Sequence, residues 1–249
     1  MALNVEWFGG YGGRGFPIPA LRGARVVARS RTTITESGIL ELPGGSVAVH
    51  RKIYRYDGTG ALLSGMFRTT FAARSRARRE AEALLRLGAL GLAPQPVVLL
   101  ERRTAGFLLE AVLAVRTVEG GRSLADAEPS PDLAAAVGRA AGAIHAAGLA
   151  DLSLAPRNLV VGRVGGGWGV FKVDSGRMAE APRGAAAQAA DLADLIAGLE
   201  GRWGPGDLEA LRSAYAAAAA GLPAGLERAM AAAREREKRR HSPPGLSIP

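Results

Sequence analysis

The stretch DLSLAPRNLVV, Asp151 to Val161, carries the pattern from which the fold of this 249-residue chain can be predicted. An acidic residue opens it, Pro156 lies in its middle, and apolar, mostly β-branched residues follow Asn158 at once. Proline interrupts regular structure, whereas a Leu-Val-Val run favours a strand. We therefore expect a short loop that ends at Asn158, where a strand begins.

The next segment predicts a β-hairpin that leads to a second acidic residue. The apolar runs NLVVGRV and WGVFKV flank glycines, and Asp174-Ser175-Gly176 follows the far strand. Asn158 begins this hairpin and Asp174 comes after it. Amide and carboxylate oxygens are ligands that suit Mg²⁺, so both residues are candidate metal ligands.

Composition excludes some classes of site and favours anionic partners. The chain has no cysteine, which excludes disulfides, thiolate metal sites and cysteine nucleophiles. Hydrophobic residues make up 48%, enough for a buried core, and no run predicts a signal peptide or a membrane span. A cytoplasmic location is the default. The net charge of +9 favours nucleotides, phosphorylated glycolipids, an acidic membrane face or nucleic acid without choosing among them.

The first half of the chain predicts a small sheet with one helix. Residues 1–22 contain GGYGGRG and are expected to form a flexible arm. Strands are expected within 24–55 and as two apolar runs within 107–118, and SRARREAEALLRLGALG predicts a helix that ends near Gly88 to Gly91.

The second half is mainly helical. Ser130 is a good N-cap with Pro131 at the first helical position. Further helices are expected near 185–201, 206–219 and 222–238. The predicted division is an arm at 1–22, one lobe at 23–118, a second at 119–240, and a disordered tail at 241–249.

Lys52 and Glu80 form a candidate ion pair. Lys52 lies on a predicted strand, and only two other lysines, Lys172 and Lys238, occur in the chain. Glu80 lies three residues after Ala77 on the helix and shares its apolar face. A carboxylate on a packed face needs a partner, and Lys52 is the obvious one.

These elements have the order that phosphoryl transfer from a nucleotide requires. The reaction uses a cation on the phosphates, an acid that holds this cation, two oxygen ligands for Mg²⁺ and a group that orients the acceptor hydroxyl. In the kinase fold they follow as strand lysine, helix glutamate, catalytic loop and metal aspartate. Ser153, five residues before Asn158, stands at the position of the catalytic group in the loop.

Five segments carry a resemblance to a known family: HRKIYRYDG, ARSRARREAEALLRLGALGLAPQP, AIHAAGL, DLSLAPRNLVV and VFKVDSGRM. They lie within about Ser46 to Leu199 and resemble the bacterial lipopolysaccharide kinase family, whose members phosphorylate core sugars. The resemblance implies an α+β, bilobal, protein-kinase-like fold, with a β-rich N-lobe that holds one helix and a mainly helical C-lobe. It implies an ATP-dependent kinase acting on an anionic glycolipid or sugar acceptor, with ATP and Mg²⁺ as cofactors.

The resemblance also implies roles for single residues. Lys52 is expected to bind ATP phosphates and Glu80 to pair with it, while Asn158 and Asp174 hold Mg²⁺. The hinge that receives adenine is expected near Thr117 to Gly121, and Asp191 or Asp194 is expected to brace the loop. We expect a cytoplasmic protein with peripheral contact at the inner membrane, and do not expect nucleic acid as a partner.

Two departures from the family pattern stand out. Ser153 occupies the place of the catalytic aspartate, and a serine hydroxyl is no base at neutral pH. Either Asp151 substitutes for it, or positioning and metal suffice, or the chain is a pseudokinase that binds a nucleotide or a protein partner without turnover. The phosphate-covering loop, expected near Arg31 to Gly38, has a single glycine.

Two basic features stay open to more than one interpretation. Four arginines near the start of the predicted helix fit a solvated face or a phosphate-binding patch: Arg74, Arg76, Arg78 and Arg79. The basic C-terminal segment fits a frayed helix end or a surface contact, and a nucleic-acid-binding module is the third-ranked function. The histidines do not cluster with acids at metal spacing: His50, His145 and His241.

Overall fold

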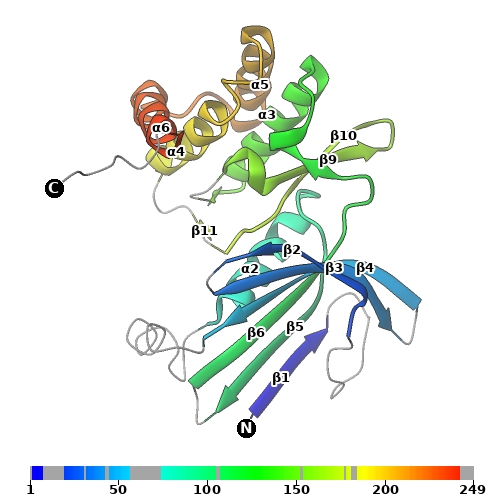
Figure 1. The fold of residues 1–249 in the computed structure, drawn as a ribbon. Coiled ribbons are helices and arrows are strands. Elements are labelled where there is room, and N and C mark those ends of the chain that lie inside the picture. The colour runs from blue at the N-terminus through cyan, green and yellow to red at the C-terminus, as the bar shows by residue number, and fades with distance from the viewer. Residues whose placement is uncertain are drawn as a thin grey trace, which may run out of the picture. The chain divides into compact units, whose positions relative to one another are not determined.

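The computed structural model shows an α+β protein with a large antiparallel sheet, the fold class predicted from the sequence (Figure 1). It describes residues 2–7, 20–30, 32–42, 45–56, 74–104, 107–151, 154–176, 178–180 and 184–241. The chain divides into two compact units. The first is drawn from Met1–Ala89, Ala93–Glu119 and Asp174–Gly176, and the second from Leu90–Leu92, Gly120–Val173 and Arg177–Pro249.

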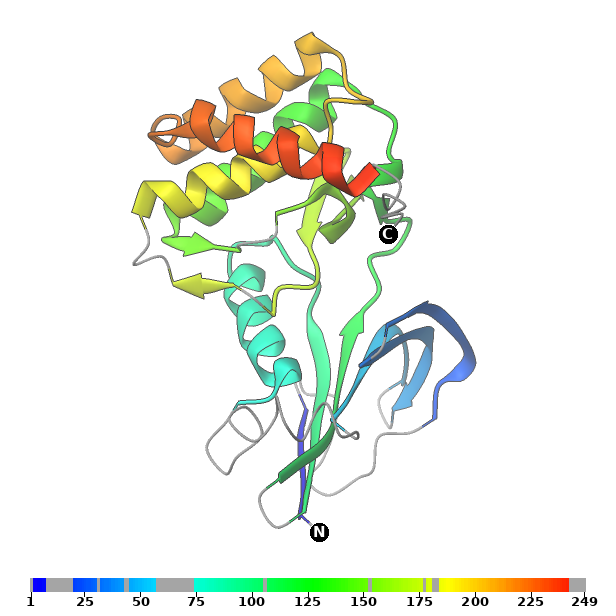
Figure 2. The ribbon, with the colours of Figure 1, turned by 60° about the vertical axis from the view of Figure 1, so that its left-hand side comes forward.

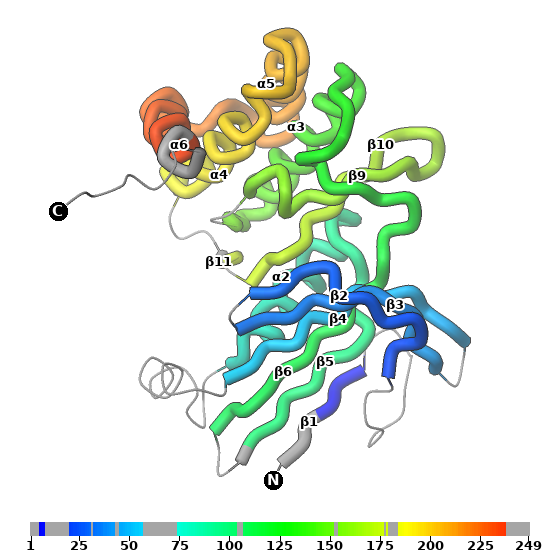
Figure 3. Tube along the Cα trace, in the orientation of Figure 1, coloured from blue at the N-terminus to red at the C-terminus, as the bar shows by residue number. Residues whose placement is uncertain are grey.

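The first unit contains a six-stranded antiparallel sheet and one helix. Along the sheet the strands follow the order β1, β5, β6, β4, β3, β2 (Figure 3). Their bounds are β1 Ala2–Trp7, β2 Arg22–Arg29, β3 Thr33–Leu42, β4 Gly45–Arg55, β5 Pro96–Thr104 and β6 Phe107–Arg116. Helix α2, Arg76–Gly88, packs on one face of the sheet, and apolar side chains from both fill the space between them.

Helix α2 begins where a capping side chain supports it. The Ser75 hydroxyl accepts a hydrogen bond from the Arg78 amide at 2.9 Å, which satisfies one of the amides at the helix start. Not every leucine of the helix lies on the packed face, because Leu85 is 44% exposed whereas Leu87 is fully buried. Glu80 remains on the packed face, where its side chain is 2% exposed.

The opposite face of the sheet corrects the prediction of an N-terminal arm. Ala2–Trp7 is strand β1, antiparallel to β5, and Val5 and Trp7 pack on a second cluster that includes Leu40 and Val98. The flexible-arm prediction is therefore wrong for residues 2–7. Strand β5 was also missed, and the two apolar runs expected within 107–118 form the single strand β6.

The second unit is mainly helical (Figure 2). Its helices are α3 Pro131–Ala146, α4 Gly184–Ala197, α5 Pro205–Ala219 and α6 Leu226–His241, with 3₁₀ turns η1 Leu124–Asp126 and η2 Pro156–Asn158. The strands are β7 Arg122–Ser123, β9 Leu159–Val164 and β10 Gly167–Lys172 in one sheet, and β8 Leu149–Ala150 with β11 Ala179–Glu180 in another. The predicted cap is present, because Ser130 accepts a hydrogen bond from the Leu133 amide.

Two glycines let helices α3 and α5 approach closely. A Cβ added at Gly138 would lie 2.2 Å from the Leu211 carbonyl oxygen, and one at Gly142 would lie 2.7 Å from Ala218 Cβ. Both distances are far below van der Waals contact. Any side chain at either position would push the helices apart.

Candidate functional site

Lys52 lies on strand β4, between β3 and β6, and its side chain projects toward the face that carries helix α2. In the sheet it is paired with Thr35 on β3 and with Leu113 on β6. Side chains alternate along a strand, so Lys52 shares its face with Tyr54. Tyr54 belongs to the same buried apolar cluster as Ala77, Ala81 and Leu84 of α2, so this face lies beneath the helix.

Glu80 meets Lys52 from helix α2. Its Oε1 lies 2.6 Å from Lys52 Nζ, and the Tyr54 hydroxyl donates a hydrogen bond to its Oε2. Both carboxylate oxygens are thus engaged, which is what a buried carboxylate requires. Tyr54 was not among the predicted site residues. Its spacing of two from Lys52 on a strand is the sequence signal that could have found it.

Asp174 is the second carboxylate that pairs with the Lys52 ammonium group. Its Oδ1 lies 3.0 Å from Lys52 Nζ, and residues Asp174–Gly176 pack with the first unit. Asp174 has a φ of 56°, a left-handed conformation that is uncommon outside glycine and that aspartate tolerates better than most residues. Its side chain is 60% exposed, so a carboxylate oxygen is accessible to a ligand.

The two carboxylates decide the protonation state of Lys52. Burial by itself favours the neutral amine, but the charges of Glu80 and Asp174 outweigh burial and raise the pKa of Lys52 above its ordinary value of 10.5. Burial, followed by the negative charge of Glu80, also raises the pKa of Tyr54 far above its usual range. Lys52 is therefore a cation and Tyr54 a neutral hydrogen-bond donor at any physiological pH.

Lys52, Tyr54 and Asp174 line an open pocket of about 230 Å³ in the first unit, called the Lys52 pocket below. Its lining consists of Ala28, Arg29, Ser30, Thr33, Thr35, Lys52, Tyr54, Arg76 and Asp174. The prediction of a phosphate-covering loop near Arg31 to Gly38 is wrong for most of this range, because Thr33–Leu42 is strand β3. Strand β2 ends at Arg29 and β3 begins at Thr33.

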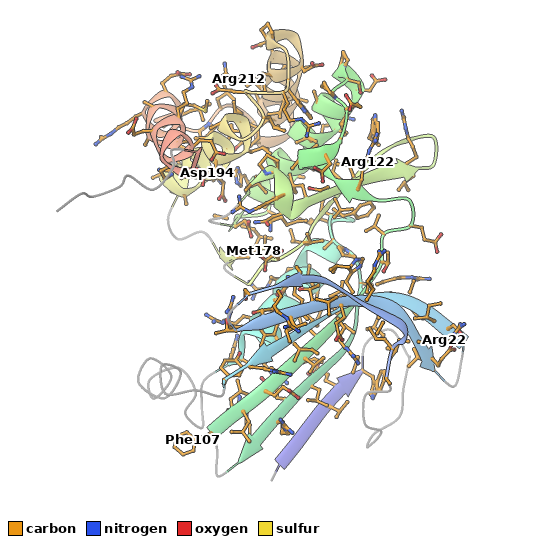
Figure 4. The ribbon with its side chains drawn as sticks, viewed as in Figure 1. Arg22, Phe107, Arg122, Met178, Asp194 and Arg212 are labelled. Atoms are coloured by element: carbon orange, nitrogen blue, oxygen red, sulfur yellow. The ribbon has the colours of Figure 1, made fainter. Side chains whose placement is uncertain are left out.

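The start of the DLSLAPRNLVV stretch lies in the second unit and is braced from helix α4. The Asp151 amide donates a hydrogen bond to Asp191 Oδ2 at 2.7 Å. Of the two acids proposed for this role, Asp191 makes the contact. Asp194, labelled in Figure 4, instead pairs with Arg236 on α6 at 2.7 Å.

Helices α3 and α5 add two side chains to this brace. His145 Nε2 lies 3.5 Å from the same Asp191 oxygen, and His145 Nδ1 lies 2.7 Å from the Tyr215 hydroxyl. His145 therefore connects α3 and α5 to the brace at Asp191. Burial, with a contribution from Asp191, raises the pKa of Tyr215 to about 12.

The Asp151 side chain is fully buried and forms an ion pair with Lys172. The distance from Lys172 Nζ to Asp151 Oδ2 is 3.1 Å, and both side chains are 0% exposed. Lys172 ends strand β10 and was noted from the sequence only as one of three lysines. Its position two residues before Asp174, among apolar residues, could have marked it as a buried cation in need of an acid.

The remaining predicted residues are placed as follows. Asn158 ends the turn η2, is 7% exposed, and its carbonyl accepts a hydrogen bond from the Val173 amide at 2.9 Å. It belongs to the second unit and Asp174 to the first, so a shared metal site stays a prediction. Ser153 lies outside the described residues. Within those described, no three His, Asp or Glu side chains gather as metal ligands.

Two further findings concern the helices and the family of the chain. None of the helices in the described ranges combines the length and the apolar composition needed to cross a bilayer. Residues 28–215 match the model of the lipopolysaccharide kinase (Kdo/WaaP) family, and no curated protein matches the chain.

Proposed function

The chain belongs to the lipopolysaccharide kinase (Kdo/WaaP) family, and from this premise we propose that it transfers a phosphoryl group from ATP to a hydroxyl of a cell-envelope glycolipid. The observation that carries the proposal is the position of Lys52 between Glu80 and Asp174 at an open pocket. The net charge of +9 suits an anionic acceptor, and we propose that this acceptor is reached at the cytoplasmic face of the inner membrane.

The residues of the Lys52 pocket fit the phosphates and cation of MgATP. Phosphate oxygens need fixed cations, which Lys52, Arg29 and Arg76 offer, and Mg²⁺ needs hard oxygen ligands, which Asp174 offers. In this proposal Glu80 keeps Lys52 charged and in place, and Asn158 supplies a second metal ligand. When bound, MgATP supplies the phosphoryl group to be transferred.

The transfer leaves one proton to be accounted for. The acceptor oxygen forms a bond to the γ-phosphorus, the bond from that phosphorus to the β–γ bridging oxygen breaks, and ADP leaves with the electron pair. The acceptor proton must then pass to a base or to water. Ser153 cannot accept it at neutral pH, and Asp151 is buried against Lys172. We propose that positioning and metal drive the transfer alone, at a loss of about 10²- to 10⁴-fold in rate.

The same two residues favour a second candidate function. Ser153 stands where the family has an aspartate, and the buried Asp151–Lys172 pair argues against a replacement by Asp151. A pseudokinase of the same bilobal, protein-kinase-like fold would keep the Lys52 site and bind a nucleotide, or a protein partner, without turnover. The adenine-receiving hinge at Thr117 to Gly121 belongs to both candidates as a prediction.

A thermal-shift titration with ATP, with and without Mg²⁺, followed by an assay of ADP release with purified lipopolysaccharide, tests the proposal. A kinase would show Mg²⁺-dependent stabilisation and turnover, and Lys52→Ala and Asp174→Asn would lose both. Glu82→Gln on the exposed side of α2 is the matched control and should behave as wild type. Stabilisation without phosphate transfer would favour the pseudokinase, and no stabilisation at millimolar ATP would refute both candidates.

A further inference from the structure

The Lys52 pocket carries two cations beyond the predicted lysine. Arg29 enters its lining from the end of β2 and Arg76 from the start of α2. Lys52 is matched by Glu80 and Asp174, whereas no described carboxylate forms an ion pair with Arg29 or Arg76. Positive charge in the pocket is therefore left for a ligand to neutralise.

Two backbone amides at the junction of β2 and β3, beside the pocket, are already engaged within the protein. A glycine-rich loop holds phosphates because its backbone can approach them closely and present N–H groups. Here the Ser30 amide donates to the Thr33 carbonyl at 2.8 Å, and the Thr33 amide donates to the Ser30 hydroxyl at 3.1 Å. Both amides are thus used within the turn itself.

The one glycine of this region has a packing role instead. A Cβ added at Gly38 would lie 3.0 Å from the Arg22 carbonyl oxygen and 3.0 Å from Leu21 Cβ. Gly38 therefore lets the start of β2 lie close against β3, well along the strand from the turn. Its presence in the sequence does not supply a phosphate-binding loop.

The Arg76 guanidinium is held in the pocket wall by neutral groups. Its Cζ lies 5.3 Å from the centre of the Tyr54 ring, and Nη1 is 3.5 Å from the Thr32 hydroxyl. These contacts orient the group without neutralising it. A guanidinium has five N–H donors in a planar fork, so one oriented in this way can still bind phosphate oxygens.

The arginine cluster at the start of α2 separates into different roles. Arg74 pairs with Glu82 at 3.0 Å, and Arg78 pairs with Glu6 of strand β1 at 3.0 Å. Arg79 is exposed and does not line the pocket. Of the four, Arg76 is the one in the pocket lining. The solvated-face interpretation thus fits Arg79, and the phosphate-binding interpretation concerns Arg76 alone.

We propose that Arg76 and Arg29 form an anion subsite for the terminal phosphates of a nucleoside triphosphate. Their side chains take the place of the amide cradle that a glycine-rich loop provides. The inference rests on the proposed function, because it assumes that the Lys52 pocket receives ATP. It adds that affinity at this pocket depends on the number of phosphates more than on the rest of the nucleotide.

Calorimetric titration of the full chain with MgATP, MgADP and AMP tests the subsite. Arg76→Gln should weaken ATP binding about tenfold to a hundredfold, because it removes charged hydrogen bonds to phosphate, and should change AMP binding less than about threefold. Arg79→Gln removes the same charge from the same helix outside the pocket and should match wild type. Arg76→Lys should restore part of the loss. Arg29→Gln, on an exposed edge strand, is an independent variant, and melting of each unliganded protein verifies folding.

The outcomes distinguish a failure of the anion subsite from a failure of the proposed kinase function. Wild type that binds MgATP, with Arg76→Gln and Arg29→Gln binding it equally well, would overturn the subsite and leave the kinase proposal intact. An equal loss for ATP and AMP would also overturn it. A titration with inorganic tripolyphosphate tests whether the pocket binds a chain of phosphates without a nucleoside. Arg76-dependent binding of tripolyphosphate without binding of any adenosine nucleotide would support the anion subsite and overturn the proposed function.

Discussion

Breaking the ion pair between Asp151 and Lys172 should destabilise the protein severely. Both side chains are fully buried, so Lys172→Met leaves a carboxylate without its charged partner in the core, and Asp151→Asn does the same to the ammonium group. Each single change should cost about 3–5 kcal/mol. For a chain of this size that corresponds to a fall in melting temperature of about 6–20 °C. The double variant should lose less than the two singles together, by about 2–3 kcal/mol.

Thermal melting of the four proteins measures this coupling, and a half-exposed ion pair in the same unit provides the control. Arg234 and Glu200 lie 2.6 Å apart, and Arg234→Met should cost no more than about 1 kcal/mol. Strictly additive effects of the two core variants would refute the coupling. So would an Asp151→Asn protein that melts as wild type but loses all phosphate transfer, because Asp151 would then be the missing base.

Three further predictions follow from single positions. Ser153→Asp should raise ADP release about a hundredfold or more while Ser153→Ala leaves it unchanged; a large loss in the alanine variant would contradict the view that the serine is inert. Gly138→Ala should cost about 3 kcal/mol or more in a melting experiment, because its Cβ would lie 2.2 Å from a carbonyl oxygen of α5, whereas Gly206→Ala has open space around it and should be neutral or slightly stabilising. The pKa of Lys52 is raised in the folded protein, so its stabilisation should be complete below pH 10.5 and disappear as the pH rises through the folded value. The difference in melting temperature between wild type and Lys52→Met should therefore be constant up to about pH 10 and shrink above it; a decrease near neutral pH would contradict this assignment.

Local spacing was sufficient to predict the pairing of Lys52 with Glu80. Helical periodicity puts Glu80 on the packed face with Ala77, and a buried carboxylate demands a cation. The structure has the two side chains 2.6 Å apart. Spacing did not predict Tyr54, nor which of the four arginines lines the pocket, because the neighbours that complete a pocket depend on how strands and helix pack.

Other features depend on contacts that the sequence does not encode locally. Asp191 and Asp194 lie three residues apart on one helix, and only their surroundings, the Asp151 amide for one and Arg236 for the other, distinguish their roles. The strand Ala2–Trp7 was missed because a glycine-rich run follows it and dominated the interpretation of residues 1–22. Its pairing with β5 crosses more than ninety residues of chain.

The clamp of two carboxylates around Lys52 also makes this residue a chemical reporter. Amine-acylating reagents attack only neutral amines, and the raised pKa keeps Lys52 protonated and unreactive at neutral pH. The 29 arginines do not react with such reagents, and a second lysine, Lys172, is sealed in the core. Modification of Lys52, distinguished by mass spectrometry from that of Lys238 and of the N-terminal amine, would therefore signal that Glu80 or Asp174 has moved away.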